Sequence, residues 1–461
     1  MTMPPDTVIE QLRELLGDKG VKVEPNDYAP DVVVRPASPE EVAGVLRICN
    51  AASQSLIPIG GMTGLVGGHQ ELAGEIGLSM ARMNAIEEID VSNRTMTVQA
   101  GCILQLAVEA AQEKGLLLPL DLGARGSATV GGNVATNAGG NRVIRYGMMR
   151  DMVLGLEVVL ADGTVISSLN KMLKNNTGYD LKQWFIGAEG TLGVITRVVL
   201  RLRPLPRSQN TALLAVDSFK QVTGLLHWLD GRTAGTLSAF EVMWPSFYEY
   251  ITREGGNHKP PLPHGSEYYV LVETLGSDPG KDAESLEEVL AGALEEGLVS
   301  DAVIAKSQSE RNAIWEIRDD VLDLFQMGPQ ALFDISVTLD NMEQFVTDLN
   351  VEMDKLQQPF CVIFGHLGDC NLHICLGSSD LDEFDPEALT RMLYDLVGQH
   401  QGSVSAEHGI GTSKRDYLNR SRDEQEMALM RRMKNMLDPQ NILNPNKVFT
   451  ADSLSQQAVN S

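Results

Sequence analysis

The segment from Gly123 to Gly140 contains eighteen residues but only one long side chain, that of Arg125. The other residues are glycine, alanine, serine, threonine, valine and asparagine. A packed core needs more side-chain volume than this, whereas a large flat ligand can lie against main chain that no side chain shields. The chain has 43 glycines, which gather in the ranges 60–68, 123–147, 187–193 and 365–411. Such clustering indicates backbone brought close to a ligand, because turns between strands would spread glycines more evenly.

The chain is acidic and has the composition of a globular protein. Its 461 residues are enough for two or three domains, and 43% hydrophobic with 21% charged residues argues against disorder. The formal net charge of −25 opposes binding to nucleic acid or an anionic membrane surface. No run approaches the roughly 18 apolar residues of a transmembrane helix, and the N-terminus lacks the pattern of a signal peptide. Five cysteines without CxxC spacing favour a reduced, cytoplasmic setting.

Periodicity and turn signals predict an α+β fold with a first domain over residues 1–206. Two prolines between Leu202 and Arg207 mark its end. Over 207–415, strands alternate with long helices, which predicts an antiparallel sheet with helices on one face. Residues 416–461 form a helical C-terminal segment. We expect helices over 7–20, 39–52, 104–114, 281–296 and 341–356, and strands over 56–59, 76–79, 95–100, 153–160, 192–201, 211–216, 268–273, 332–337 and 362–364.

Two further glycine-rich segments extend the pattern of the first. Ile57–Gly64 follows a short apolar strand, and its glycines would let main-chain N–H groups converge on an anion. It is neither GxGxxG nor a P-loop, and it lacks the lysine that a nucleoside triphosphate site needs. Asn175–Leu181 and Ile186–Thr196 form the third piece.

Together these segments resemble the FAD domain of the vanillyl-alcohol-oxidase/PCMH flavoprotein superfamily, and most of all its D-2-hydroxyacid dehydrogenases. The resemblance covers about 30 to 449 and implies a PCMH-type FAD-binding domain, a substrate domain, and a tail that returns to the FAD domain. Met62 stands where a covalent flavin link would need a histidine, which implies non-covalent FAD. The positions matching FAD-binding residues of the family are Pro58, Gly60, Gly61, Thr63, Gly64, Leu65, Ser127, Gly131, Gly132, Asn133, Thr136, Gly140, Gly190, Gly193, Ile195 and Asn444.

Three of the eight histidines lie in two short motifs, Gly365–His373 and Ser405–Gly411. Imidazole and carboxylate groups suit a borderline divalent ion such as zinc. A straight strand would send His366 and His373 to opposite faces, so Leu367–Asp369 must turn the chain if both are to meet one ion. On spacing alone, ordinary loop histidines remain the alternative.

The resemblance to metal-dependent D-2-hydroxyacid dehydrogenases implies roles for these residues. His366, His373 and Glu407 match the ligands of a divalent metal, zinc or manganese, and His408 matches the catalytic base. Arg318 matches the arginine of a Trp-x-x-Arg segment that binds the substrate carboxylate, a task that suits a guanidinium. Without the resemblance, Arg318 would be interpreted as a helix-surface residue in an ion pair.

The departures from the family bear on the substrate. Dehydrogenases of D-2-hydroxyglutarate have a threonine, a lysine and an asparagine where this chain has Leu322, Leu332 and Cys375, and Cys370 replaces a usual glycine. A second carboxylate buried beside leucines would be costly. We therefore predict a monocarboxylic D-2-hydroxy acid with an apolar side chain, such as D-mandelate, D-2-hydroxyisovalerate or D-lactate.

Several alternatives remain open on the sequence. A D-2-hydroxyglutarate dehydrogenase or an oxygen-using 2-hydroxyacid oxidase would share the same motifs. A metallohydrolase would use the histidines but not the glycine segments, and a binding protein would need neither His408 nor Arg318. The expected partners are a small 2-hydroxy acid and an electron acceptor, which is a quinone, a cytochrome or an electron-transferring flavoprotein. The family also makes a homodimer an expectation.

Overall fold

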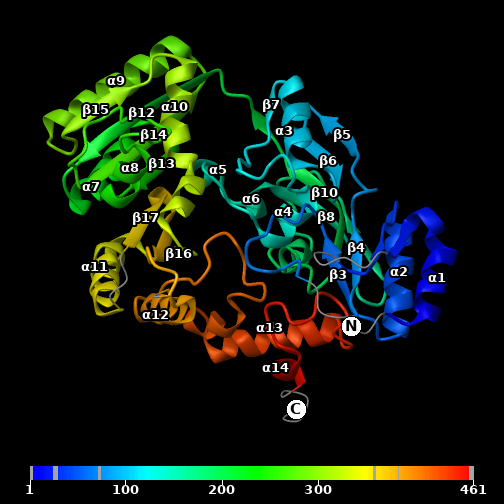
Figure 1. Ribbon diagram of the computed structural model, residues 1–461. Helices are drawn as coiled ribbons and strands as arrows, with labels where there is room; N and C mark the ends of the chain where they lie inside the picture. The colour runs from blue at the N-terminus through cyan, green and yellow to red at the C-terminus, as the bar shows by residue number, and fades with distance from the viewer. Residues whose placement is uncertain (1–3, 24–29, 71–73, 357–359, 383, 456–461) are drawn as a thin grey trace. The chain divides into compact units, whose positions relative to one another are not determined.

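The computed structural model describes residues 4–23, 30–70, 74–356, 360–382 and 384–455, and the chain divides into two compact units (Figure 1). Unit 1 comprises Met1–Gly140, Gly147–Leu205 and Glu407–Ser461, and unit 2 comprises Asn141–Tyr146 and Pro206–Ala406. The sequence places the corresponding boundaries after residues 206 and 415. In the structure Thr412 bonds through its N–H to the Val66 carbonyl, which draws the segment from Glu407 onward into unit 1.

Unit 1 begins with a small sheet of order β1-β2-β4-β3, in which β4 is parallel to both β2 and β3. Helix α1 packs against α2 through an apolar stripe that includes Ile9, Leu12 and Leu16, with the spacing of one helix face. The Ser38 hydroxyl caps the first turn of α2. The elements are α1 (Asp6–Leu16), η1 (Asp18–Gly20), β1 (Val21–Val23), β2 (Val32–Val34), α2 (Pro39–Ala51), β3 (Leu56–Ile59) and β4 (Ile76–Ser79).

A second, antiparallel sheet of unit 1 has the order β5-β6-β10-β8-β9. Its strands β10 and β8 are buried almost throughout, as central strands with both faces covered are. Its strands are β5 (Ile86–Asp90), β6 (Thr95–Gln99), β8 (Val153–Val159), β9 (Val165–Ser168) and β10 (Val194–Arg201). The remaining elements are α3 (Leu104–Glu113), β7 (Leu116–Leu117), α4 (Val130–Thr136), α6 (Met149–Met152), η2 (Leu181–Trp184), β11 (Arg203–Pro204), η5 (Arg415–Arg420), α13 (Glu424–Leu437) and α14 (Ala451–Ser455).

The C-terminal tail is built into unit 1 by main-chain pairing. The N–H of Leu56 donates to the Ile442 carbonyl, and the N–H of Asn444 donates to the Leu56 carbonyl. The tail therefore forms a short parallel bridge at the β3 edge of the first sheet. Lys434 on α13 is buried and donates to Asp438 and to the carbonyls of Thr191 and Leu443. Burial lowers the pKa of this lysine, and the adjoining Asp438 opposes that shift.

Unit 2 contains one seven-stranded antiparallel sheet of order β15-β12-β14-β13-β17-β18-β16. Its strands are β12 (Ser208–Val216), β13 (Leu237–Met243), β14 (Tyr268–Gly276), β15 (Asp301–Ile304), β16 (Gln330–Ser336), β17 (Phe360–His366) and β18 (Asn371–Gly377). Its helices are α5 (Val143–Tyr146), α7 (Phe219–Arg232), α8 (Pro245–Ile251), α9 (Pro279–Glu295), α10 (Gln308–Asp319), η3 (Val321–Met327), α11 (Leu339–Leu356), η4 (Leu367–Asp369) and α12 (Pro386–Gln399).

Residues 141–146 belong to unit 2 although the chain on both sides of them lies in unit 1. Arg142 pairs with the buried Glu273 of β14 at 3.0 Å, and Arg145 donates to the Leu275 carbonyl at 2.6 Å. A buried carboxylate needs such a partner, and this pairing holds the segment on the sheet.

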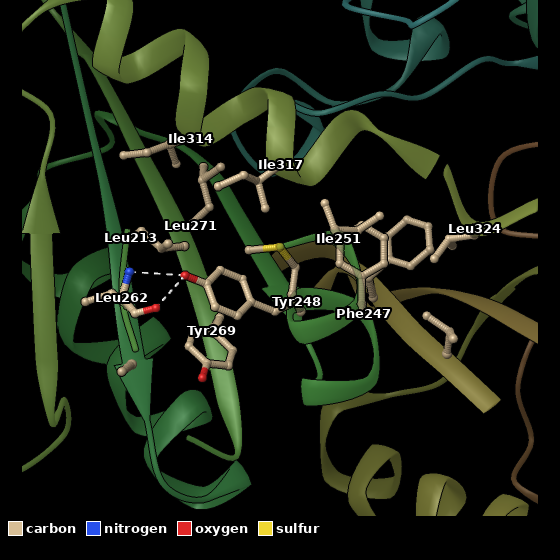
Figure 2. Close-up of a cluster of buried hydrophobic side chains, with 14 of the residues drawn as sticks. Leu213, Phe247, Tyr248, Ile251, Leu262, Tyr269, Leu271, Ile314, Ile317 and Leu324 are labelled. Carbon is tan, nitrogen blue, oxygen red and sulfur yellow. Dashed lines mark hydrogen bonds between the residues drawn. The ribbon is translucent and has the colours of Figure 1, made fainter. Parts of the chain in front are cut away.

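One face of the unit 2 sheet packs against α8, α10 and η3 in a core of apolar side chains (Figure 2). Tyr248 and Tyr269 stack at its centre with ring centroids 3.7 Å apart. The Tyr248 hydroxyl donates to the Leu262 carbonyl, which satisfies its polar end within the core. Phe364 of β17 and Cys375 of β18 belong to the same core, so it extends to the strands that carry the histidine motif.

The expected fold class, α+β with an antiparallel sheet in the second domain, is confirmed. The predicted strands over 56–59 and 76–79 coincide with β3 and β4, and the other predicted strands and helices overlap observed elements. Among the described residues, no helix combines the length and apolar character that a bilayer crossing requires.

Candidate active site

A cavity of about 380 Å³ lies within unit 1. The loop after β3, the segment around α4 and the start of β10 form its walls, together with Glu407, His408 and Asn444 from the C-terminal part of the chain. The cavity is lined by most of the positions that the resemblance assigned to FAD: Pro58, Gly60, Gly61, Thr63, Gly64, Leu65, Gly131, Gly132, Asn133, Thr136, Gly190, Gly193, Ile195 and Asn444.

Two of the predicted FAD-binding residues, Ser127 and Gly140, do not line this cavity. Their role toward FAD stays a prediction. A Cβ on Gly61 would lie 2.0 Å from the Ser127 carbonyl oxygen, so the first loop rests directly on that main chain. Gly140 has φ +154°, and a Cβ there would lie 2.1 Å from the Asp121 carbonyl oxygen. Ser127 and Gly140 are thus packed closely against neighbouring main chain.

Some glycines that line the cavity are needed because other segments of the chain pack directly against them. A Cβ on Gly131 would lie 2.6 Å from the Cβ of Ala100 and 2.9 Å from its carbonyl oxygen, so α4 can approach β6 only because Gly131 has no side chain. Gly126, in the same glycine-rich segment, would meet nothing within 4 Å. The segment thus combines positions that require glycine with positions that do not.

Glu189 joins three parts of the chain at the cavity. It is buried, and its carboxylate accepts from the N–H groups of Ile410 at 2.7 Å and Gly411 at 2.8 Å. Its carbonyl accepts from the side-chain amide of Asn444 at 2.7 Å. Burial raises the pKa of Glu189, and the two N–H donors partly offset this. The sequence analysis missed Glu189, although its place inside the glycine-rich segment 187–193 was a signal.

The cavity has features that fit a dinucleotide cofactor. Nearly half of the residues that line it are glycine or alanine, which leave main-chain groups open to a ligand. The Oδ1 atom of Asn444, which lines the cavity, is buried and has no donor among the described residues. A buried acceptor without a donor is costly, so a polar group of a cofactor would satisfy it.

The histidine motif lies in unit 2, where β17 and β18 are joined by η4. The ring centroids of His366 and His373 are 5.2 Å apart, so the predicted turn at Leu367–Asp369 is confirmed. Cys370 closes this turn with φ +68°, a left-handed conformation that glycine adopts at less cost. A glycine at this position, which the resemblance implies for the family, would adopt the same turn without that cost.

His366, Arg318 and Glu241 form a buried cluster in unit 2. His366 Nδ1 lies 2.7 Å from Glu241 Oε1, and Arg318 Nε donates to Glu241 Oε2 at 2.7 Å. Arg318 Nη2 lies 3.2 Å from His366 Nε2. Burial alone would raise the pKa of Glu241, but His366 and Arg318 outweigh it and lower this pKa below its ordinary value.

Arg318 is therefore buried, and the alternative interpretation from the sequence, a residue on the helix surface, is wrong. The residue is 4% exposed, its Nε donates to Glu241, and its Nη2 lies 3.2 Å from His366 Nε2. Glu241 was not predicted from the sequence, because a fully buried, largely apolar strand with one glutamate gives no sign of which partner that glutamate meets.

Glu407 and His408 line the unit 1 cavity and directly follow unit 2 in the chain. Ala406, the last residue of unit 2, donates its N–H to Asp334 Oδ2 at 3.1 Å. Asp334 is fully buried and is the register partner of His373 in the β16–β18 ladder. Its carboxylate accepts from the Asn371 side-chain amide at 3.0 Å. The end of unit 2 is thus held next to β16, the strand that pairs with the His373 strand β18.

The three positions that bear on the substrate lie in unit 2. Leu332 pairs with Cys375 across β16 and β18, one same-face position before the Asp334–His373 pair. Leu332 and Leu322 are both exposed. Cys375 is buried in the apolar core, and burial raises the pKa of its thiol to about 12. None of the three side chains offers a charge to a ligand.

Comparison with known proteins gives a consistent result. Residues 30–168 match a family described as FAD binding domain, and residues 205–448 match FAD linked oxidases, C-terminal domain. The mitochondrial D-2-hydroxyglutarate dehydrogenase of Bos taurus is 42% identical over 419 residues, which are 91% of this chain and 76% of that protein. The D-2-hydroxyglutarate dehydrogenase of Xanthomonas citri is 37% identical over 426 residues, covering 91% and 89% respectively.

A solved structure extends the likeness to the fold. p-Cresol methylhydroxylase with substrate bound superposes with a TM-score of 0.77 at 18% sequence identity, covering 97% of each chain. At this identity the match concerns the fold alone, and it agrees with the expected PCMH-type domain.

Proposed function

The chain belongs to the FAD-linked oxidases, and among them to the family of the D-2-hydroxyglutarate dehydrogenases, and from this we propose that it oxidises a D-2-hydroxy acid to the 2-oxo acid. The observation that carries the proposal is the glycine-walled cavity of unit 1, which His408 lines beside the positions matched to FAD. Neither a metallohydrolase nor a non-catalytic binding protein accounts for these positions.

Two groups would supply chemistry that side chains lack. When bound in the unit 1 cavity, FAD supplies the acceptor for the hydride that leaves the substrate Cα. A divalent ion, zinc or manganese, supplies a Lewis acid that lowers the pKa of the substrate hydroxyl. We propose His366, His373 and Glu407 as its ligands. The two imidazoles are neighbours in unit 2, and Glu407 directly follows Ala406, which Asp334 holds.

The remaining roles fall to Arg318 and His408. The terminal nitrogens of Arg318 would bind the substrate carboxylate by charge-assisted hydrogen bonds. His408 would take the hydroxyl proton, as an imidazole can near neutral pH. Its place in the lining of the unit 1 cavity supports this assignment. FAD is proposed to bind without a covalent link, because Met62 occupies the position where the first loop would need a histidine.

We propose a monocarboxylic substrate with an apolar side chain, such as D-mandelate, D-2-hydroxyisovalerate or D-lactate. Leu322, Leu332 and Cys375 offer no charged or strongly polar partner to a second carboxylate. D-2-Hydroxyglutarate is the second candidate, favoured by the names of the relatives from Bos taurus and Xanthomonas citri.

The acceptor, assembly and location of the protein are further parts of the proposal. A quinone, a cytochrome or an electron-transferring flavoprotein would reoxidise the flavin, and the acidic composition suits a basic protein partner. Steady-state formation of peroxide would instead identify an oxidase. A homodimer, which the family resemblance implies, and a reduced, cytoplasmic setting, which the few cysteines favour, are part of the proposal; gel filtration with light scattering would test the dimer.

Anaerobic bleaching of the flavin absorbance by a panel of D-2-hydroxy acids, with and without EDTA, tests the proposal. We expect rapid bleaching by D-mandelate or D-2-hydroxyisovalerate, little by D-2-hydroxyglutarate, and loss of bleaching with EDTA that added zinc or manganese reverses. Preferential bleaching by D-2-hydroxyglutarate would keep the reaction and discard the monocarboxylic substrate. A colourless protein would contradict the flavin chemistry altogether.

A further inference from the structure

Glu241 uses both of its carboxylate oxygens inside the fold. Oε1 lies 2.7 Å from His366 Nδ1 and Oε2 accepts from Arg318 Nε at 2.7 Å. The side chains of Glu241 and Arg318 are 1% and 5% exposed, so water does not compete for either bond. Glu241 and His366 are also direct partners in the β13–β17 ladder, which holds the carboxylate opposite the ring.

This geometry determines where His366 carries its proton. An ionised carboxylate only accepts hydrogen bonds, so Nδ1 must be the donor to Glu241. On the other side of the ring, Nε2 faces a guanidinium nitrogen, which only donates, at 3.2 Å. Nε2 therefore presents its lone pair, because a second N–H there would oppose the N–H of Arg318. A lone pair on Nε2 is what a metal ligand needs.

We propose that Glu241 is a positioning residue, which holds His366 in the Nδ1–H tautomer, so that Nε2 carries the lone pair that a divalent ion would take over from Arg318 Nη2, and which fixes Arg318 by its Nε. The inference rests on the proposed function in that it takes His366 as a metal ligand. Carboxylates commonly play this part behind metal-binding histidines, and their loss weakens metal affinity by about 10–100-fold. Here one carboxylate orients the ligand and the substrate-binding arginine together.

Glu241→Gln is the test variant, because the amide keeps the shape but can accept on one side only. FAD-loaded, EDTA-treated protein would be titrated with Zn²⁺ in competition with a chromogenic chelator. We expect the affinity for Zn²⁺ to fall by about 10–100-fold. Glu273→Gln is the matched control, since Glu273 is equally buried in the same sheet and bonds to Arg142 and Trp315. Its affinity for Zn²⁺ should stay within about twofold of the wild type.

A second readout follows the histidine ring directly. The ¹⁵N shifts of labelled histidine distinguish a protonated from an unprotonated ring nitrogen, and a His366→Asn variant assigns the signal. We expect the Nδ1–H tautomer in the wild type and in Glu273→Gln, and a mixture of tautomers in Glu241→Gln. If Glu241→Gln does not fold, Glu241→Asp serves instead, because the shorter side chain keeps the charge but cannot reach both partners.

The outcomes separate this inference from the proposed function. Wild-type Zn²⁺ affinity in His366→Asn would mean that the proposed metal site is wrong. Weakened binding in His366→Asn, with wild-type affinity and tautomer in Glu241→Gln, would overturn the role of Glu241 alone. Weakened binding in both variants, with Glu273→Gln unaffected, would support it.

Discussion

The side-chain amide of Asn444 donates to the main-chain carbonyl of Glu189 at 2.7 Å, although 255 residues separate the two in the sequence. The same amide donates to the Gly68 carbonyl at 3.2 Å, and the Glu189 carboxylate accepts from the turn after His408. The C-terminal tail, the segment before β10 that carries Glu189, and the turn after His408 are thus joined around one cavity. A change in any of them is expected to affect the others.

Asn444→Asp should reduce the affinity for FAD by about tenfold or more, because a carboxylate would replace the donor to two carbonyls and leave them unpaired. Aspartate tolerates the positive φ of this position, so backbone strain is not introduced. The flavin-to-protein absorbance ratio after dialysis measures the effect. Asn435→Asp is the control, since Asn435 lies on α13 and makes only a 3.4 Å bond to Leu454. Equal flavin retention in both variants would contradict the expectation.

Gly131→Ala should destabilise unit 1 by about 1–3 kcal/mol and lower its flavin content, because the new methyl group would overlap Ala100. Gly126→Ala lies in the same segment and meets nothing within 4 Å, so it should have wild-type properties. Thermal unfolding followed by flavin fluorescence compares the two variants. If both behave alike, the close approach of α4 to β6 is not what requires a glycine at 131.

His408→Gln should bind FAD normally but reduce the flavin about 10²–10⁴-fold more slowly with substrate, because the proton acceptor is lost. Anaerobic stopped-flow spectroscopy measures this rate. His400→Gln provides the control, since His400 pairs with Asp348 at 3.0 Å and is none of the residues assigned to the site. Reduction at the wild-type rate in His408→Gln would assign the base elsewhere.

Leu332→Lys should shift the preference toward D-2-hydroxyglutarate. A new hydrogen bond to a second carboxylate is worth about 1.5–3 kcal/mol, so the ratio of kcat/KM for D-2-hydroxyglutarate over D-lactate should rise at least about tenfold. Val351→Lys is a matched control, because Val351 is 49% exposed and Leu332 is 47% exposed. An unchanged ratio in Leu332→Lys would place the distal end of the substrate elsewhere.

Buried thiols should make the protein less stable in alkali. Burial raises the pKa of Cys49 from 9.0 to about 12, and that of Cys102 to about 11. Above pH 9 the unfolded chain loses these protons while the folded chain keeps them. Stability therefore falls by up to about 1.4 kcal/mol per pH unit for each thiol, from pH 9 toward about 12 for Cys49 and toward about 11 for Cys102. The urea midpoint of Cys49→Ala should fall less between pH 8 and 10.5 than that of the wild type, and equal falls would contradict the assignment.

Much of the fold could be predicted from local patterns. Strands such as 56–59 and 76–79 are short apolar runs between turn residues, and their limits coincide with β3 and β4. The glycine segment 123–140 predicted a ligand surface, because a lack of side chains is visible in the sequence itself. The motifs also singled out the two histidines that the β17–β18 turn brings together.

Other features were decided by tertiary structure alone. Glu241 lies 125 residues from His366, and only the register of β13 against β17 makes them partners. Ser127 and Gly140 match cofactor residues by position, and only the structure shows that neither lines the cavity and that both pack against neighbouring main chain. The sequence by itself determined where ligand-accessible backbone and chemically active side chains lie along the chain, because both are properties of residue type. Which buried charges meet was decided by the fold, because long-range strand pairing sets those distances and no local pattern encodes them.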